Sequence, residues 1–415
     1  MRQTEFMFQT GMLYQQACLK KTNDCKTEVV HMITESKLLD RKILKSGHNY
    51  DQNLIWVVLL MTAFSLMMIY SASIAYASHD GGSPWFYLER QAIFVAIGGL
   101  GALAISKIPM WLWKKATPYV LGISFILLVA VLFGREVNGA KRWIGIGPFN
   151  IQPSEVFKLA AIFYLSSFFT RRADILKDLK KVWYVGIPIG LGLGLLMMEP
   201  DFGSTVVVTV IFLGLVYLAG LPARWFAVII TFCVAALGLL ILIAPYRMAR
   251  MTSFLDPFKD PMGKGYQLSH ALMAIARGEW FGVGLGASLE KRFYLPEAHT
   301  DFIFAVIAEE FGFLGMVALI FCYGWLVWRA FSIGKQARDL DLYFSAFVAK
   351  GIGIWLGIQS FFNIGVNIGL LPTKGLTLPL MSYGGSAVIV MLCCMAILLR
   401  IDYENRRKMR GYQVE

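Results

Sequence analysis

Residues 54–77 read LIWVVLLMTAFSLMMIYSASIAYA, a run of 24 residues without a charged side chain. An α-helix needs about 20 mostly apolar residues to cross roughly 30 Å of hydrocarbon, so this run by itself predicts a membrane span. The rest of the chain agrees, because 57% of its 415 residues are hydrophobic and only 16% are charged. A soluble domain of this length could not bury so much apolar surface, and the sequence therefore predicts a membrane protein.

Nine further apolar runs follow the first and are separated by polar breaks. The ten predicted spans cover residues 54–77, 91–108, 118–134, 155–170, 182–198, 203–219, 225–245, 301–331, 343–367 and 385–401. The predicted fold class is therefore all-α, a polytopic transmembrane domain over residues 54–401 with ten transmembrane helices.

Lysine and arginine are distributed unequally between the two sets of connections. Seventeen lie in one set, at the ends of its spans or in the C-terminal tail, whereas the opposite short loops hold few. The few include Arg135, Lys141, Arg142 and Lys374. Because cytoplasmic loops carry the excess of positive charge, we expect residues 1–53 and 402–415 to be cytoplasmic tails and residues 246–300 to form a large extracytoplasmic loop.

The net charge of +12 does not indicate a nucleic-acid partner here, because much of it sets topology and faces anionic lipid headgroups. None of the six cysteines falls in an expected outer loop, so no disulfide framework is predicted.

Ionisable residues near or inside spans are costly and mark candidate sites. In QPSEVFK, residues 152–158, Glu155 and Lys158 lie three residues apart on one helical face and are expected to form an ion pair, structural or functional, while Ser154 could cap the helix. In EPDFGS, residues 199–204, a short outer turn presents two carboxylates, and Asp201 is either a helix cap or a site residue.

Two further places carry unusual polarity. Glu309 and Glu310 are adjacent inside the eighth span, where we favour a structural role and expect a cavity or Lys350 of the ninth span as their partner. Residues 367–386 contain two prolines and paired glycines, so this segment is expected to re-enter or to lie over a cavity instead of spanning. Its Lys374 could extend to the headgroups or hold a phosphate.

The large loop contains DPFKDPMGKGYQ at residues 256–267 and YLPEAHTDF at residues 294–302. Together with Arg142-Trp143, QPSE, EPDFGS, LPTKGLT at residues 371–377 and SYGG at residues 382–385, these strings resemble the SEDS family (shape, elongation, division and sporulation). The polar leader and the LPTKGLT segment are more similar to the cell-division members than to the elongation members.

The resemblance implies a peptidoglycan polymerase of the bacterial inner membrane at the division septum. Such an enzyme transfers the disaccharide-pentapeptide of lipid II to the 4-hydroxyl of another lipid II, with inversion and release of undecaprenyl diphosphate. It also implies a class B penicillin-binding protein and other division proteins as partners, in contact with membrane lipids.

The same resemblance implies the site residues. Asp301 is the expected catalytic base, although with Thr300 as cap it could serve only to stabilise the start of its helix. Arg142, Lys158 and Lys374 are expected near the diphosphate, with Glu155 holding Lys158, Asp201 contacting a sugar or a metal, and His299 contacting substrate. A divalent cation, Mg²⁺ or Mn²⁺, could share the task, with Asp201 and Glu155 as candidate ligands.

Two other functions fit the same composition. A lipid II transporter would also need many spans and buried charges around an anionic-lipid cavity, and a scaffold could simply hold a transpeptidase. The polar residues gather towards the expected outer face instead of the midplane, which favours the polymerase.

Overall fold

A computed structural model describes residues 50–79, 83–134, 136, 141–146, 149–172, 179–243, 254–260, 262–263, 265–373 and 375–414. Contacts divide the chain into two units, one of residues 50–405 with residue 415 and one of residues 1–49 with 406–414. In the second unit only residues 406–414 are described, and they end in a turn. All further description concerns the first unit, apart from the end of the last helix.

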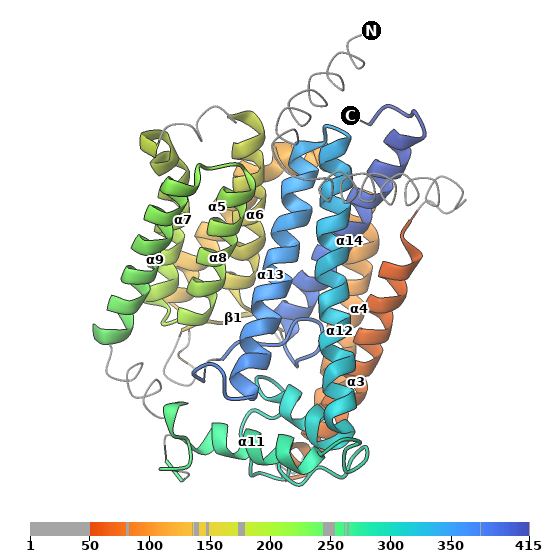
Figure 1. Cartoon of the computed structure of the whole chain (residues 1–415). Coiled ribbons are helices and arrows are strands. Elements are labelled where there is room, and N and C mark those ends of the chain that lie inside the picture. Colours follow the sequence, from red (N-terminus) through yellow and green to blue (C-terminus); the bar gives the residue numbers. More distant parts are fainter. Residues whose placement is uncertain are drawn as a thin grey trace, which may run out of the picture. The chain divides into compact units, whose positions relative to one another are not determined.

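The structure is helical with one small hairpin (Figure 1). The elements in chain order are α3 (Gln52–His79), α4 (Phe86–Ile105), α5 (Met110–Leu132), β1 (Ile144–Ile146), β2 (Phe149–Ile151), α6 (Pro153–Arg171), α7 (Leu179–Met198), α8 (Phe202–Leu218), α9 (Ala223–Ile243), α11 (Tyr266–Gly278), α12 (Ile303–Asp339), α13 (Tyr343–Asn367) and α14 (Gly385–Met409).

Each of the ten predicted runs lies mostly within one of these helices. Seven of the described helices are long and apolar enough to cross a membrane, and two shorter apolar helices lie at Tyr184–Met198 and Phe202–Leu218. Helix α6 carries the buried Glu155 and Lys158. Helix α14 continues to Met409, so the expected tail from residue 402 begins as helix.

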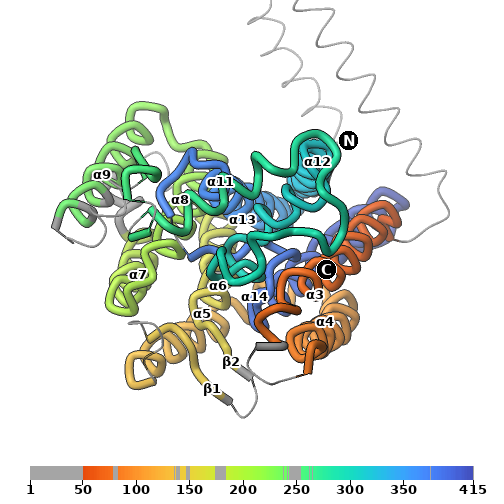
Figure 2. Tube along the Cα trace, turned by 90° about the horizontal axis from the view of Figure 1, so that it is seen from below, coloured from red at the N-terminus to blue at the C-terminus, as the bar shows by residue number. Residues whose placement is uncertain are grey.

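Helix α13 lies at the centre of the bundle and packs against α12, α6 and α8. Figure 2 shows α3 and α4 on one side of it and α7 and α9 on the other. Close approach between helices relies on small residues, as is common in membranes. At Gly192 of α7, for example, a Cβ atom would lie only 1.9 Å from the ring of Phe157 on α6.

A buried ion cluster joins three chain segments at the end of the bundle opposite α11. Arg329 of α12 bonds to Asp51, immediately before α3, and to Asp402 of α14 at 3.1 Å. Glu404 of α14 accepts from the main-chain N–H of Met110 at 2.9 Å and from Arg400 at 2.8 Å. Each buried charge therefore has an opposite charge or a hydrogen-bond donor, as the cost of burial requires.

Helix α11 crosses the other end of the bundle, over α12 (Figure 1). Here α12 is broken at Gly312, which has φ 66° and ψ −163°. The loop after α11 supplies the missing hydrogen bonds: Val283 N–H donates to the carbonyl of Glu309 at 2.9 Å, and Phe313 N–H donates to that of Glu279 at 2.8 Å. The break therefore fixes the loop between α11 and α12 to the helix.

Replacing Gly312 by alanine should destabilise this junction. The backbone conformation is one that only glycine adopts readily, and a Cβ atom would lie 2.4 Å from the main-chain nitrogen of Gly282. We expect a loss of about 1–3 kcal/mol in the free energy of unfolding, seen as a lower melting temperature in detergent. Gly324→Ala is the matched control, because Gly324 lies in the same helix with no other group within 4 Å of its Cβ position. Equal melting temperatures for the two variants would contradict this account.

Candidate active site

Asp301 lies just before α12, which begins at Ile303. Its main-chain carbonyl accepts from the side-chain amides of Asn363 at 2.9 Å and Asn367 at 3.1 Å, both on α13. A Cβ atom on Gly375 would lie 3.1 Å from its Oδ2 atom, so the carboxylate faces residue 375. Asp301 is half-buried.

The expected role of Thr300 as a helix cap is wrong. The hydroxyl of Thr300 bonds to the carbonyl of Glu297 at 3.1 Å and to its carboxylate at 2.7 Å. The residue that precedes α12 is Phe302, which makes no side-chain cap bond. Asp301 is therefore outside the first helical turn, and helix capping does not explain its presence.

The segment between α13 and α14 enters the bundle without forming a helix, as predicted. Leu376, Leu378, Leu380 and Met381 are all buried. The carbonyls of Leu376, Thr377 and Met381 accept from Asn363 at 2.6 Å, Gln359 at 3.0 Å and Ser65 at 2.8 Å. Irregular backbone is stable among transmembrane helices only when its polar groups are paired in this way. Lys374 lies outside the described residues.

Glu155 and Lys158 form the predicted ion pair, with Nζ 2.7 Å from Oε1. Both are buried, and Lys158 also donates to Gln359 at 2.9 Å and lies 5.0 Å from the ring centroid of Trp355. Gln359 in turn donates to the carbonyl of Thr377. The pair therefore reaches the re-entrant segment through Gln359, and its observed role is to hold that segment. Ser154 makes no cap bond at the start of α6, contrary to the expectation.

The EPDFGS turn joins α7 to α8. Asp201 caps α8 as predicted, with its Oδ1 accepting from Ser204 N–H at 3.1 Å. Arg142 donates to the carbonyl of Pro200 and makes no ion pair with either acid among the described residues. A Cβ atom on Gly203 would lie 2.9 Å from Leu376, so this turn packs on the re-entrant segment.

Glu199 was not among the predicted site residues. It is fully buried, and neither of its carboxylate oxygens has a hydrogen-bond partner in the part of the chain that the structure describes. Burial and the nearby charge of Asp201 raise the pKa of Glu199 to about 8, against a smaller lowering by Arg142. The second oxygen of Asp201 also has no partner among the described residues. In the sequence, the signal for Glu199 is its position two residues before Asp201, a second acid in the same short turn.

His299 lies in an aromatic cluster. Its ring centroid is 4.6 Å from that of Tyr87 and 5.5 Å from that of Tyr383, and its carbonyl accepts from Tyr383 N–H at 2.9 Å. Burial lowers the pKa of His299, and Glu297 partly opposes this, so the imidazole is neutral near pH 7. The structure thus places His299 between α4 and the start of α14.

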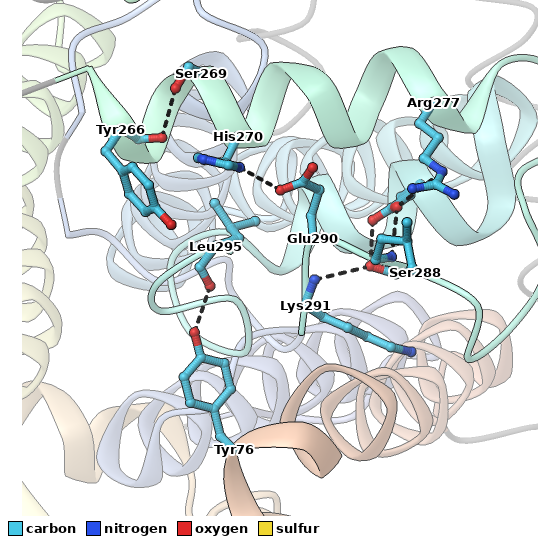
Figure 3. A network of polar contacts seen from close by, with 11 residues as sticks. Tyr76, Tyr266, Ser269, His270, Arg277, Ser288, Glu290, Lys291 and Leu295 are labelled. Atoms are coloured by element: carbon cyan, nitrogen blue, oxygen red, sulfur yellow. Dashed lines mark hydrogen bonds and ion pairs between the residues drawn. The ribbon is translucent and has the colours of Figure 1, made fainter. Parts of the chain in front are cut away.

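Glu309 and Glu310 bind the loop between α11 and α12 and not Lys350, which packs against Gly334 elsewhere on α12. Glu310 accepts from Lys291 at 2.6 Å and from Ser71 of α3 at 2.7 Å. Glu309 accepts from Leu289 N–H at 2.9 Å and from the hydroxyl of Ser288, and Arg277 of α11 lies 3.8 Å away (Figure 3).

The two adjacent glutamates do face different partners, and their role is to anchor the loop, which agrees with the structural role that the sequence favours. His270 of α11 adds a further contact to the loop, 2.7 Å from Glu290 (Figure 3). Sequence reasoning missed Lys291 of the loop and Arg277 of α11, although buried acids need cationic partners.

Three amide residues of α13 were also missed. Gln359, Asn363 and Asn367 are spaced four residues apart and are all buried. That spacing places them on one face of the helix, and an amide stripe in an apolar helix is a detectable signal.

Three of the predicted site residues thus converge on one tripeptide, residues 375–377. Asp301 faces Gly375, the Asp201 turn packs on Leu376, and Lys158 reaches Thr377 through Gln359. Among the described residues, no group of three or more histidine, cysteine or acidic side chains could hold a metal. Any cation here would have to rely on fewer protein ligands and on its substrate.

The sequence profile described as Cell cycle protein, which covers FtsW, RodA and SpoVE, matches residues 51–407. The chain belongs to this family. A probable peptidoglycan glycosyltransferase FtsW of Neisseria gonorrhoeae is 57% identical, over 91% of this chain and 90% of the relative. Another of that name, from Aromatoleum aromaticum, is 48% identical over 91% of this chain and 94% of its own.

Solved structures agree with the fold. A chain from a study titled "Structural coordination of polymerization and crosslinking by a peptidoglycan synthase complex" is 29% identical, with a TM-score of 0.68, over 86% of this chain and 98% of that one. The crystal structure of the rod shape determining protein RodA of Thermus thermophilus is 28% identical, with a TM-score of 0.62, over 86% of this chain and 97% of that one. The family expected from the motifs is therefore confirmed, and so is a mostly helical fold with several helices able to cross a membrane.

Replacing Lys158 by methionine should destabilise the protein, because Glu155 would remain buried without its cation. Breaking a buried pair in this way costs about 3–5 kcal/mol. Thermal unfolding in detergent measures the loss. The double variant Glu155→Gln with Lys158→Met is the control and should recover much of it, since no lone charge remains. Equal melting temperatures for the single and double variants would contradict the pairing.

Proposed function

We propose that this protein is a peptidoglycan glycosyltransferase that polymerises lipid II. The observation that carries the proposal is the position of Asp301, which faces Gly375 of the re-entrant segment. The family membership and the naming of close relatives as peptidoglycan glycosyltransferases support the same reaction.

The reaction is a single displacement. The 4-hydroxyl oxygen of the acceptor sugar bonds to the anomeric carbon of the donor, and the bond from that carbon to the diphosphate oxygen breaks with inversion. Asp301 takes the hydroxyl proton as general base, a contribution of about 10²–10⁴ in rate. Arg142 and Lys374 are proposed to stabilise the negative charge on the departing diphosphate. Lys158 acts indirectly, because its Nζ is already committed to Glu155 and Gln359.

A divalent cation is proposed beside the diphosphate, at Asp201 and Glu199. Magnesium is commonly held by one or two carboxylates together with substrate phosphates, and these two buried acids have oxygens without partners among the described residues. Glu155 fits less well, since it is paired with Lys158. When bound, such a cation would neutralise charge on the leaving group.

We further infer ten spans, both termini in the cytoplasm, and an outer position for residues 246–300, on the basis of the distribution of basic residues. The site then opens to the outer face of the bacterial inner membrane, at the division septum. The relative in a complex for polymerization and crosslinking supports a class B penicillin-binding protein as partner, and other division proteins are proposed with it.

Asp301→Asn should abolish strand formation while leaving the fold intact. The amide keeps the size of the side chain but cannot accept the hydroxyl proton. Purified protein with its transpeptidase partner is incubated with fluorescent lipid II, and glycan strands are resolved on a gel. Glu279→Gln, an exposed acid in the same loop, is the control and should polymerise normally. Wild-type strand formation by Asp301→Asn would refute the role of the base, and lipid translocation without strands by the wild type would indicate a transporter.

The cation proposal predicts Mn²⁺ binding by electron paramagnetic resonance with undecaprenyl diphosphate present. Binding should strengthen as the pH rises towards 8, because a proton on Glu199, whose pKa is raised to about 8, competes with the metal below that pH. Glu199→Gln and Asp201→Asn should each weaken it at least about tenfold. Glu136→Gln, an exposed acid, is the control. Unchanged Mn²⁺ affinity in both site variants would exclude these two ligands.

A further inference from the structure

Asn363 connects Asp301 to the re-entrant segment. Its side-chain nitrogen donates to the carbonyl of Asp301 at 2.9 Å and to that of Leu376 at 2.6 Å. The side chain is only 2% exposed, so water does not compete for these bonds. This one amide therefore fixes the distance between the main chains of residues 301 and 376. The carboxylate of Asp301 and the neighbouring Gly375 face each other beside it.

Asn367 lies one helical turn further along α13 and fixes the other side of Asp301. Its nitrogen donates to the Asp301 carbonyl at 3.1 Å and to the carbonyl of Asn363 at 2.8 Å, and its oxygen accepts from Ala305 N–H at 3.1 Å. The partners determine the orientation of this amide, because an N–H can only donate and a carbonyl can only accept. Asn367 thereby caps α12 from another helix, a task that Phe302 does not perform.

The two asparagines hold Asp301 by its main chain. Both bind its main-chain carbonyl, and the carboxylate faces Gly375. Residues 299–302 have no regular helix or strand of their own. The position of this turn consequently depends on bonds from α13, the central and well-buried helix.

We propose that Asn363 and Asn367 are positioning residues that hold the Asp301 base against Gly375 of the re-entrant segment. This inference rests on the proposed catalytic role of Asp301. Orientation of a catalytic group is worth a large part of the rate, and a displacement of about 1 Å can cost about 10²-fold. The asparagines act through the main chain and make no contact with the transferred sugar.

Steady-state polymerisation by purified full-length variants with the transpeptidase partner tests the proposal. Asn363→Leu keeps the size of the side chain and removes both donors, and Asn367→Leu removes the second donor to Asp301 while leaving the Leu376 bond intact. We expect kcat to fall at least about tenfold in each, with KM for lipid II within about twofold. Faster amide hydrogen exchange over residues 299–306 should accompany the loss.

Ser360→Ala is the matched control. Ser360 is equally buried on α13, one turn before Asn363, but its hydroxyl bonds only to Leu356 and Gly357 of its own helix. This variant should keep wild-type kcat and wild-type exchange over residues 299–306. Melting temperatures in detergent identify folded variants, and Asn367→Leu carries the test if Asn363→Leu does not fold.

Wild-type kcat in the folded leucine variants would overturn the proposal, and so would a tenfold rise in KM with unchanged kcat, which would indicate a substrate contact. Failure of the positioning role can be distinguished from failure of the proposed function. If Asp301→Asn forms strands normally, the catalytic assignment itself falls. If Asp301→Asn is inactive but the leucine variants polymerise at the wild-type rate, only the positioning role falls.

Discussion

The main chain of residues 375–382 runs among transmembrane helices without forming a helix, and its carbonyls therefore need donors from side chains. Four of its carbonyls accept hydrogen bonds from side chains, namely those of Asn363, Gln359, Ser65 and Tyr323. A carbonyl left without a donor in such a place would cost roughly several kcal/mol. These contacts therefore decide where the segment can lie. Because Gly375 lies against the Asp301 carboxylate, the same donors decide the geometry of the proposed active site.

Buried charge is used in a similar way. Lys158 and Glu155 form a pair deep in the bundle, yet the structural effect of Lys158 is to orient the Gln359 amide, whose other end binds Thr377. Glu309 and Glu310 anchor the loop between α11 and α12 through Leu289 and Lys291. In both cases the cost of burying ions is offset by close pairing, and the pairs specify where irregular chain is attached to regular helices.

The order of the loop between α11 and α12 follows from these attachments. The break at Gly312 exposes main-chain groups of α12, and residues 279–284 bond to them. Together with the glutamate contacts, this fixes the loop on both sides of the break, and the chain then leads through residues 294–300 to Asp301. The loop is thereby part of the scaffold that brings Asp301 to α13.

The sequence by itself determined the helical membrane fold, since each apolar run became a helix, and the motifs identified the family. It also predicted the Glu155 pair, the Asp201 cap and the irregular segment before α14, because these depend on neighbours within a few residues or on proline and glycine. It was wrong about Ser154 and Thr300 as caps and about Lys350, and it did not identify Glu199, Lys291 or the asparagines of α13 as parts of the site. Those roles depend on contacts between residues as far apart as Ser71 and Glu310, or Asp301 and Asn367. Only the packing of the helices decided them, because side-chain spacing along one helix gives its faces but not the partner that each face meets.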